Sequence, residues 1–204
     1  MTFLFDIGRV LLDFDFESSL KKLLPLNALD GDHRLLRLLD RKDDFESGNI
    51  AVNDYIDWAL EILGSDATQA EFCEAWQHIF TPNPPMWDCV RKLAAGGHRL
   101  ILFSNTNAIH CPWIFEQFPG FSVFDGQVLS FEVGSVKPEP PIYQAAIDSW
   151  KLIPQDTLYI DDLPANIETG RRFGFRCWQY EMANHADFEN WLAREINLSL
   201  SPTP

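Results

Sequence analysis

The sequence feature that most constrains the fold is a short apolar run near the N-terminus that ends abruptly in a carboxylate. Phe3, Leu4 and Phe5 stand directly before Asp6, and Gly8 follows two residues later. Because the run is apolar at every position, it predicts a strand buried on both faces, as in a parallel sheet. Asp6 then lies at the strand's carboxyl end, where ligands bind in open α/β sheets. A carboxylate buried there needs a metal ion, another cation or a role as a nucleophile.

The composition of the 204-residue chain indicates an ordinary globular protein. Hydrophobic residues make up 46% and charged residues 23% of the sequence, and the length fits one domain with an insertion or two small domains. No apolar run approaches the roughly 18–20 residues of a membrane span. The N-terminus lacks the basic-then-apolar pattern of a signal peptide. We therefore expect a soluble, cytoplasmic protein that does not bind a membrane, and its oligomeric state cannot be read from the sequence.

The formal net charge of -14 excludes some partners. A sequence-independent nucleic-acid binder needs lysine and arginine to contact phosphates, so we expect no nucleic-acid partner. An anionic substrate would have to be held by local cations, because the overall field does not attract it. The four cysteines show no CxxC spacing. Cys73, Cys89 and Cys177 have apolar neighbours and are expected to be reduced core residues, whereas Cys111 lies in a predicted loop.

Strands and helices alternate over most of the chain. Buried strands are predicted at 100–103, 157–160 and 175–178, and a short extended piece lies within 123–129. Helices are predicted at 86–95, from 108 to about 118, at 140–150, from Pro164 to about Gly174, and at 187–196, with a frayed tail at 199–204. Right-handed crossovers between such strands give a parallel sheet with helices on both faces. We therefore predict an α/β fold with a Rossmann-like core.

Residues 16–81 interrupt this alternation and are predicted to be helical throughout, with no strand. One helix is indicated by the leucines at 35–39, and a second at 52–63 is ended by Gly64. A capping box at Thr68 and Glu71 opens a third. Residues 13–16 are predicted to form a turn that leaves the core. The expected division is a core of residues 1–15 and 82–204, with a helical insertion at 16–81 over the end of the first strand.

Polar residues follow three of the predicted strands, and a lysine lies on a loop between the last two. They are Asp6, Ser104, Asn105, Asp161, Asp162 and the loop residue Lys137. A parallel sheet would bring them to one edge. An aspartate such as Asp6 can attack phosphorus and form an acyl phosphate, which water then hydrolyses. Mg²⁺ prefers oxygen ligands with one or two carboxylates, which Asp6 and one of Asp161 and Asp162 can supply, with the Gly8 carbonyl as a third.

The remaining polar groups suit a phosphate ligand. The Ser104 hydroxyl and nearby backbone amides can hold phosphate oxygens, and Lys137 can offset the charge on Asp6 and on the phosphoryl group. The four segments involved are residues 5–10 (Phe-Asp-Ile-Gly-Arg-Val), 103–107 (Phe-Ser-Asn-Thr-Asn), 136–138 (Val-Lys-Pro) and 159–162 (Tyr-Ile-Asp-Asp). In order and spacing they resemble the four motifs of the haloacid dehalogenase (HAD) superfamily. The helical insertion resembles the C1-type cap of that superfamily.

The resemblance is narrower at two segments. The Asp-x-Gly-x-Val and Ser-Asn-Thr-Asn patterns are similar to the branch that holds α-D-glucose-1-phosphate phosphatase and the phosphatase domain of soluble epoxide hydrolases. By this resemblance Asp6 is the nucleophile, Lys137 is the electrostatic lysine, and Ser104 and Asn105 bind the phosphate. Asp162 is the better metal ligand, and Asp161 beside it is a further ligand or an outer group.

One residue departs from the pattern of the family. Most HAD phosphatases carry a second aspartate two residues after the nucleophile as general acid and base, but here that residue is Gly8. General acid–base help is worth about 10²–10⁴-fold in rate. Three readings stay open: a slow phosphatase, a preference for good leaving groups, or an acid from elsewhere. Candidates for that acid are Asp13, Asp15 and Glu46. His110, which follows the 103–107 segment, is expected to lie on the surface in a loop.

The function expected from these features is a Mg²⁺-dependent phosphatase that hydrolyses a small phosphomonoester, such as a sugar phosphate, through an aspartyl-phosphate intermediate. Two alternatives remain. The first is a metal-free 2-haloacid dehalogenase that uses Asp6 on a carbon–halogen bond, although the Asp161 and Asp162 pair argues for a metal. The second is a HAD protein that binds a phosphorylated ligand without turnover, which the missing acid at Gly8 leaves open.

Overall fold

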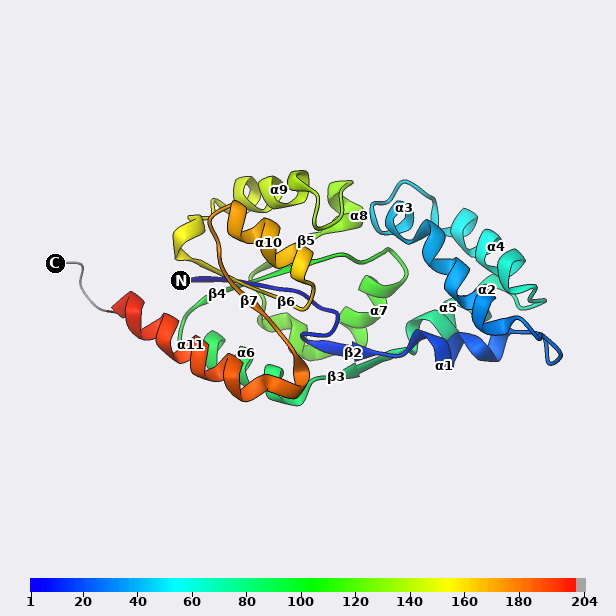
Figure 1. The fold of residues 1–204 in the computed structure, drawn as a ribbon, viewed down its shortest axis with the longest axis horizontal. Coiled ribbons are helices and arrows are strands. Elements are labelled where there is room, and N and C mark those ends of the chain that lie inside the picture. Colours follow the sequence, from blue (N-terminus) through cyan, green and yellow to red (C-terminus); the bar gives the residue numbers. More distant parts are fainter. Residues whose placement is uncertain (201–204) are drawn as a thin grey trace.

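The chain folds around a five-stranded parallel sheet with the N-terminal strand at its centre (Figure 1). The structure, a computed structural model, describes residues 1–200. In spatial order the strands are β5 (Gly126–Leu129), β4 (Arg99–Ser104), β1 (Thr2–Phe5), β6 (Thr157–Asp161) and β7 (Arg176–Gln179). Every neighbouring pair is parallel, so the carboxyl ends of all five strands lie at one edge. The predicted α/β architecture with a Rossmann-like sheet is confirmed.

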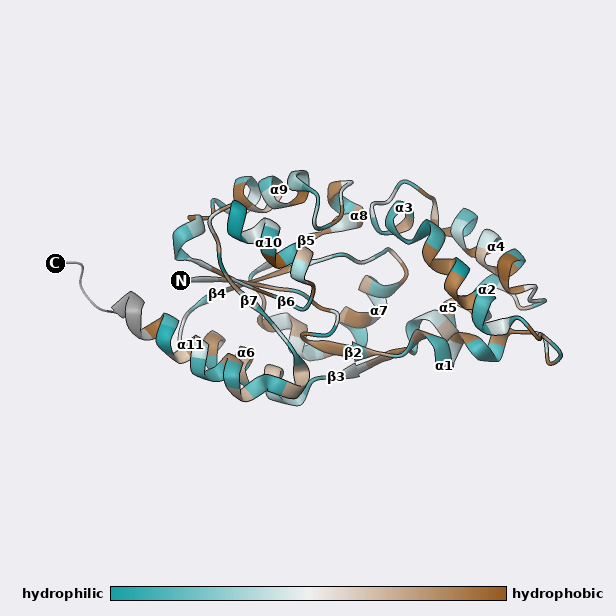
Figure 2. Ribbon diagram, in the orientation of Figure 1, coloured by the Kyte–Doolittle hydropathy of each residue, from teal (hydrophilic) through white to brown (hydrophobic). Residues whose placement is uncertain are grey.

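Helices cover both faces of this sheet (Figure 1). The helices on one face are α6 (Pro84–Ala95), α7 (His110–Gln117) and α11 (His185–Leu200), and those on the other are α9 (Pro140–Trp150) and α10 (Pro164–Arg172). The short helix α8 (Ser130–Val133) follows β5. Hydrophilic residues are frequent along α10 and α11 (Figure 2), which accords with helices that cover the outside of a layered core.

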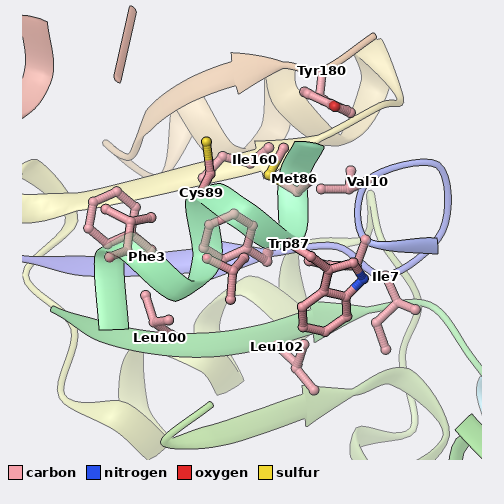
Figure 3. Packing of buried hydrophobic residues seen from close by; sticks show 14 of the residues in the cluster. Phe3, Ile7, Val10, Met86, Trp87, Cys89, Leu100, Leu102, Ile160 and Tyr180 are labelled. Carbon is pink, nitrogen blue, oxygen red and sulfur yellow. The ribbon is translucent and has the colours of Figure 1, made fainter. Parts of the chain in front are cut away.

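Successive residues of β1 point to opposite sides and so contribute to two apolar layers. Phe3 and Phe5 belong to a cluster with Met86 and Trp87 of α6, which Figure 3 shows at close range. Leu4 belongs to a second cluster, with side chains of α9 and α10. The Phe3, Leu4 and Phe5 side chains are all inaccessible to solvent. Burial of each stabilises the fold by about 1.5–3 kcal/mol, so β1 is fixed at the centre and Asp6 is held at its end.

A helical lobe, defined here as α1 to α5, lies beyond the carboxyl ends of the strands (Figure 1). Its helices are α1 (Phe16–Leu20), α2 (Gly31–Arg37), α3 (Lys42–Glu46), α4 (Val52–Leu63) and α5 (Gln69–Gln77). The lobe has an apolar cluster of its own that includes Leu35, Phe45, Tyr55, Ile56 and Phe72. Short 3₁₀ helices span Lys21–Leu23, Leu38–Arg41, Pro119–Val123, Pro154–Asp156 and Met182–Asn184.

Two short strands at the junction of the sheet and the lobe were not predicted from the sequence. β2 (Leu12–Phe14) pairs antiparallel with β3 (Phe80–Pro82), so the chain is extended where a turn and the end of a helix were predicted. The two segments that connect the sheet with the lobe run side by side, and the hydrogen bonds between them satisfy their backbone amides and carbonyls. The Phe14 and Phe80 rings meet edge to face, with 6.3 Å between centroids, and add a cross-strand contact.

The predicted helix ends agree with the structure at several points. Gly64 takes a left-handed conformation, with φ of 64°, at the end of α4. The capping box of Thr68 and Glu71 is present at the start of α5, and Pro164 is the first residue of α10. Within the predicted tail, residues 199 and 200 instead belong to α11, and residues 201–204 lie outside the described part. All four cysteines are free, and Cys111 is buried in α7 rather than in a loop.

Candidate active site

The residues that the sequence singled out converge at the carboxyl edge of the sheet. Asp6 directly follows β1, Ser104 ends β4, and Asp161 ends β6. Lys137 reaches this edge from the loop between α8 and α9. The Asp6, Asp161 and Asp162 carboxylates each have an oxygen within 4.8 Å of the others. The parallel register between β1, β4 and β6 therefore assembles groups that are up to 156 residues apart in the chain.

Lys137 is the charged centre of the site. Its Nζ lies 2.6 Å from Asp161 Oδ2 and 3.0 Å from Asp6 Oδ1, and it also donates to the Phe103 carbonyl at 2.7 Å. The side chain is 1% exposed, so an uncharged amine would be the default for an isolated lysine there. The two carboxylates reverse that preference and raise the pKa of Lys137 despite the opposing effect of burial. The ammonium stays charged and links the two acids.

Asp161 has no oxygen left over for a further ligand. Its Oδ2 accepts from Lys137 Nζ and from Tyr159 Oη, both at 2.6 Å. Its Oδ1 accepts from the Leu163 backbone and from Asn166 Nδ2, both at 2.9 Å. Tyr159 and Asn166 were not identified from the sequence. Tyr159 could have been identified from the sequence, because it lies two residues before Asp161 in a strand and its side chain therefore points to the same side.

Asp162, unlike Asp161, is not held by neighbouring side chains. Its side chain makes no ion pair and no hydrogen bond with another side chain in the described part of the chain. Burial, helped by the negative charges of Asp6 and Asp161, raises its pKa to about 7. Burial likewise raises the pKa of Asp6, with Lys137 opposing the effect. Three carboxylates thus face one ammonium, which leaves negative charge at the site uncompensated.

The end of β4 contributes a hydroxyl and an amide with different tasks. Ser104 is buried, and its hydroxyl donates to the Asn105 carbonyl at 3.2 Å. Its side chain is also one of the influences that lower the pKa of Asp6, which burial raises overall. The Asn105 side chain pairs with the backbone of Lys137: Nδ2 donates to the carbonyl at 2.8 Å, and Oδ1 accepts from the amide at 2.7 Å. The Asn105 side chain therefore fixes the loop that carries Lys137, and its amide group is already occupied.

The loop after Asp6 approaches the cavity with its backbone. Leu11 and Leu12 amides both donate to the Ile7 carbonyl at 2.9 Å, which closes a tight turn around Gly8. Arg9 in this turn has a φ of 56°. A Cβ atom on Gly8 would lie 3.2 Å from the Phe14 ring, so a side chain at this position would crowd β2. Gly8 lines the cavity and brings no ionisable group to it.

A cavity of about 420 Å³ opens over this edge and is closed by the helical lobe. Asp6, Ser104, Lys137 and Asp162 lie in its wall at the sheet. The opposite wall is formed by residues of the lobe and its links, among them Phe14, Leu38, Lys42, Glu46, Tyr55, Trp76 and Phe80. A small organic molecule fits such a volume, with a charged group at the sheet and its remainder against the mostly apolar lobe.

The structure separates the three candidate acids. Asp13 accepts from Arg9 and from the Phe14 amide, and Asp15 caps α1 through the Ser18 amide. Neither lines the cavity, whereas Glu46 does. His110 also lines it and is buried, so the prediction of a surface position was wrong. The error arose because His110 was taken as a loop residue, whereas Trp76 and Gln77 of α5 pack on Ile109 and His110.

Fold and site together are those of an α/β protein whose candidate reacting groups lie at the carboxyl edge of a parallel sheet. The family model of haloacid dehalogenase-like hydrolases matches residues 1–174. The chain belongs to the haloacid dehalogenase-like hydrolases, as its four motifs predicted.

Two characterised relatives refine this assignment. A D-ribitol-5-phosphate phosphatase from Bacteroides thetaiotaomicron is 28% identical over 204 residues, which span 95% of this chain and 97% of the relative. Bifunctional epoxide hydrolase 2 of Rattus norvegicus is 37% identical over 51 residues, which are 25% of this chain and 9% of that protein. Both agree with the branch that the first two motifs resemble.

Solved structures of the family have the same architecture. A HAD-family enzyme from Bacteroides thetaiotaomicron, in a magnesium complex, has a TM-score of 0.74 at 25% identity and covers 90% of this chain and 94% of its own. L-2-haloacid dehalogenase from Xanthobacter autotrophicus, with chloropropionic acid covalently bound, has a TM-score of 0.63 at 17% identity and covers 86% and 75%. The second likeness is one of fold alone.

Among the residues that the structure describes, none of the helices combines the length and the hydrophobicity that a membrane span requires.

Proposed function

We propose that the protein is a Mg²⁺-dependent phosphatase that hydrolyses a small phosphomonoester, such as the phosphate of a sugar or sugar alcohol. The observation that carries the proposal is the asymmetry between the two adjacent acids. Asp161 is fully hydrogen-bonded and holds Lys137, while Asp162 is uncommitted at the same edge. A metal-free site would have no evident use for a second, partly buried carboxylate whose charge is not offset.

The donor set fits Mg²⁺. Every candidate ligand is an oxygen, namely the Asp6 and Asp162 carboxylates and the Gly8 carbonyl, and Mg²⁺ prefers oxygen with one or two protein carboxylates. The magnesium complex of the HAD-family relative supports this cofactor. When bound there, Mg²⁺ supplies positive charge that offsets the carboxylates and the phosphoryl oxygens. We assign Asp161 the role of holding Lys137, so Asp162 is the direct ligand of the pair.

The residues of the chain then divide the reaction between them. Asp6 attacks phosphorus in line and forms an aspartyl phosphate, and water cleaves that intermediate to release phosphate. Lys137 keeps Asp6 ionised and oriented, because its Nζ lies 3.0 Å from Asp6 Oδ1. The Ser104 hydroxyl binds a phosphoryl oxygen, whereas the Thr106 amide of the same segment already donates to Ser130 Oγ at 2.9 Å. Asn105 contributes by fixing Lys137, since its own amide group is used there.

We propose the same division into domains that the sequence suggested, with residues 1–15 and 82–204 as the core and 16–81 as a C1-type cap. The apolar cluster of the lobe, which includes Ile109 from the 82–204 part but otherwise comes from residues 16–81, supports this division. The cap would hold the organic part of the substrate, because it forms the wall of the cavity opposite Asp6.

A substrate panel tests this function. Sugar, sugar-alcohol and aryl phosphates are assayed for phosphate release with Mg²⁺ and with excess chelator. We expect release from at least one sugar or sugar-alcohol phosphate that chelator abolishes and Mg²⁺ restores. Absence of Mg²⁺-dependent release from every compound contradicts the proposal. Halide release from 2-haloacids that survives chelation would instead identify a dehalogenase, and phosphate binding without turnover would identify a non-catalytic binder.

A further inference from the structure

We propose that Glu46 of α3 is the general acid and base of the reaction, in place of the aspartate that most relatives carry where this chain has Gly8. The inference rests on the proposed phosphatase function, which requires a proton for the oxygen of the leaving alcohol. Gly8 cannot give that proton. Glu46 comes from the helical lobe, on the opposite wall of the cavity from Asp6. A group on that side is directed toward the organic part of a bound phosphoester.

The position of Glu46 singles it out among the acids of the site. Of the described residues that line the cavity, Glu46 is the one carboxylic acid that does not stand on the sheet edge with Asp6 and Asp162. Its Oε2 atom is inaccessible to solvent and forms an ion pair with Lys42 Nζ at 3.3 Å, without a directed hydrogen bond. A buried carboxyl oxygen of this kind keeps the capacity for a further hydrogen bond, which a ligand can supply. The cavity is where such a ligand would lie.

The segment that carries Glu46 is fixed by one contact within the lobe and one with the core. Phe45 is buried and stacks on Tyr55 with 3.9 Å between ring centroids and 3° between ring planes. Gly48 turns the chain with a φ of 73°, and a Cβ atom there would come within 2.7 Å of the Phe131 carbonyl of α8. Only glycine allows this approach. The two anchors flank Glu46 and fix its height over the sheet edge, which a proton donor needs.

Burial favours the protonated form of Glu46. Lys42 Nζ lies 3.3 Å from Oε2, and this ammonium lowers the pKa of the carboxyl. Burial acts more strongly in the other direction, and the negative charges of Asp43 and Asp6 add to it, so the pKa of Glu46 is raised. The negative charge of Asp6 contributes to the raised pKa of Glu46, so the protonation of the proposed acid depends on the charge of the proposed nucleophile. Lys42 then stabilises the carboxylate that remains after proton transfer.

The proton balance closes over the two steps. In the first, the Asp6 oxygen bonds to phosphorus, the bond from phosphorus to the ester oxygen breaks, and its electron pair takes the proton from Glu46 to give the alcohol. In the second, the Glu46 carboxylate takes a proton from the attacking water as the aspartyl phosphate is cleaved. Phosphate and free Asp6 result, and Glu46 regains its proton. No further reactant is needed.

The decisive experiment compares two leaving groups in the full-length protein with saturating Mg²⁺. A 4-nitrophenyl phosphate leaves without protonation, whereas an alkyl phosphate such as a sugar-alcohol phosphate needs an acid. We expect Glu46→Gln to lose about 10²–10⁴-fold in kcat/KM on the alkyl phosphate and less than about tenfold on the aryl phosphate, because kcat/KM reports the first step, in which the leaving group departs. In the second step, which both substrates share, the variant lacks the base, so its kcat falls on both. A retained kcat/KM on the aryl phosphate proves that the variant is folded with an intact site. The matched control is Asp44→Asn, an exposed acid on the same helix that does not line the cavity, which should change neither rate.

The outcomes separate the two proposals. Equal losses of kcat/KM on both substrates, or no loss on either, overturn the role of Glu46 as the acid while leaving a phosphatase in place. A wild-type protein that releases phosphate from neither substrate overturns both. The pH profile gives an independent reading: the fall in alkyl phosphate turnover at high pH, where Glu46 loses its proton, should be absent from Glu46→Gln. An unchanged profile in that variant also contradicts the proposal.

Discussion

Lys137 Nζ lies 2.6 Å from Asp161 Oδ2, and the two side chains are 1% and 0% exposed. Asp161 accepts three more hydrogen bonds, from Tyr159, Asn166 and the Leu163 backbone, so its charge is fully satisfied within the protein. A buried charge with this many partners is a fixed part of the scaffold. The adjacent Asp162 has none of these contacts, and the two acids therefore have different consequences when they are changed.

Asp161→Asn is expected to destabilise the protein, and Asp162→Asn is expected not to. The first change leaves Lys137 with one carboxylate and directs an amide donor at groups that donate, and breaking a buried ion pair costs about 3–5 kcal/mol. The second removes a carboxylate whose ionised form is already disfavoured by burial. Urea unfolding at pH 7.5 measures both. In activity assays Asp162→Asn should require much more Mg²⁺, and equal unfolding midpoints for the two variants would contradict the distinction.

Lys137→Met should abolish turnover and also weaken the fold. Methionine fills a similar volume but leaves Asp6 and Asp161 as buried neighbours without a cation, so their mutual repulsion is no longer offset. Lys137→Arg is the informative companion, because a guanidinium keeps the charge but is planar and too large for a site that is 1% exposed. Neither variant should exceed about 1% of the wild-type kcat. Substantial turnover by Lys137→Met would show that Asp6 does not depend on this lysine.

Asp6→Asn should eliminate turnover without the loss of stability expected for Asp161→Asn. The pKa of Asp6 is raised by burial, so its negative charge is a cost to the folded state that asparagine removes. The amide oxygen can still accept from Lys137, whereas the amide cannot attack phosphorus. Phosphate release and thermal unfolding are measured on the same preparation. Full activity in a freshly purified variant would exclude Asp6 as the nucleophile.

The sequence predicted the sheet edge well because each of its parts was local. The three central strands β4, β1 and β6 are largely apolar and buried, and Asp6, Ser104 and Asp161 follow or end them directly, so register alone brings these residues together. The β2 and β3 pair was missed because its three-residue strands have no periodicity of their own and exist only where two passages of the chain meet. Contacts of this kind depend on the tertiary fold.

The different roles of residues with the same chemistry could not be predicted from the sequence either. Asp161 and Asp162 are chemically identical and adjacent, and only the donors around Asp161 distinguish them. Among Asp13, Asp15 and Glu46, nothing in the local pattern indicates which one faces the cavity. That choice is made by the packing of α3 over the sheet edge, through the close approach of Gly48 to Phe131. Which of the candidate acids faces the cavity therefore depends on contacts between distant parts of the chain, which the local sequence pattern does not show.

His110 joins the core to the helical lobe through two hydrogen bonds. Asn107 Oδ1 accepts from the amides of Ile109 and His110, so its Nδ2 is the donor to His110 Nδ1 at 3.1 Å. The proton of the neutral ring is then on Nε2, which donates to the Trp76 carbonyl of α5 at 3.0 Å. The ring also stacks on Trp76, with 5.4 Å between centroids. A protonated ring would place a charge in this apolar contact.

This arrangement predicts that acid weakens the folded state through His110. Burial lowers the pKa of His110 from its ordinary 6.5 to about 3, so between these values the unfolded chain binds a proton that the folded protein does not. The stabilising contribution is therefore complete above about pH 6.5, declines as the pH falls, and amounts to several kcal/mol in all. His110→Gln should be less stable at pH 7.5 but lose less stability between pH 7 and pH 5. Urea unfolding at a series of pH values measures this, and parallel curves for the two proteins would show that His110 is not buried in its neutral form.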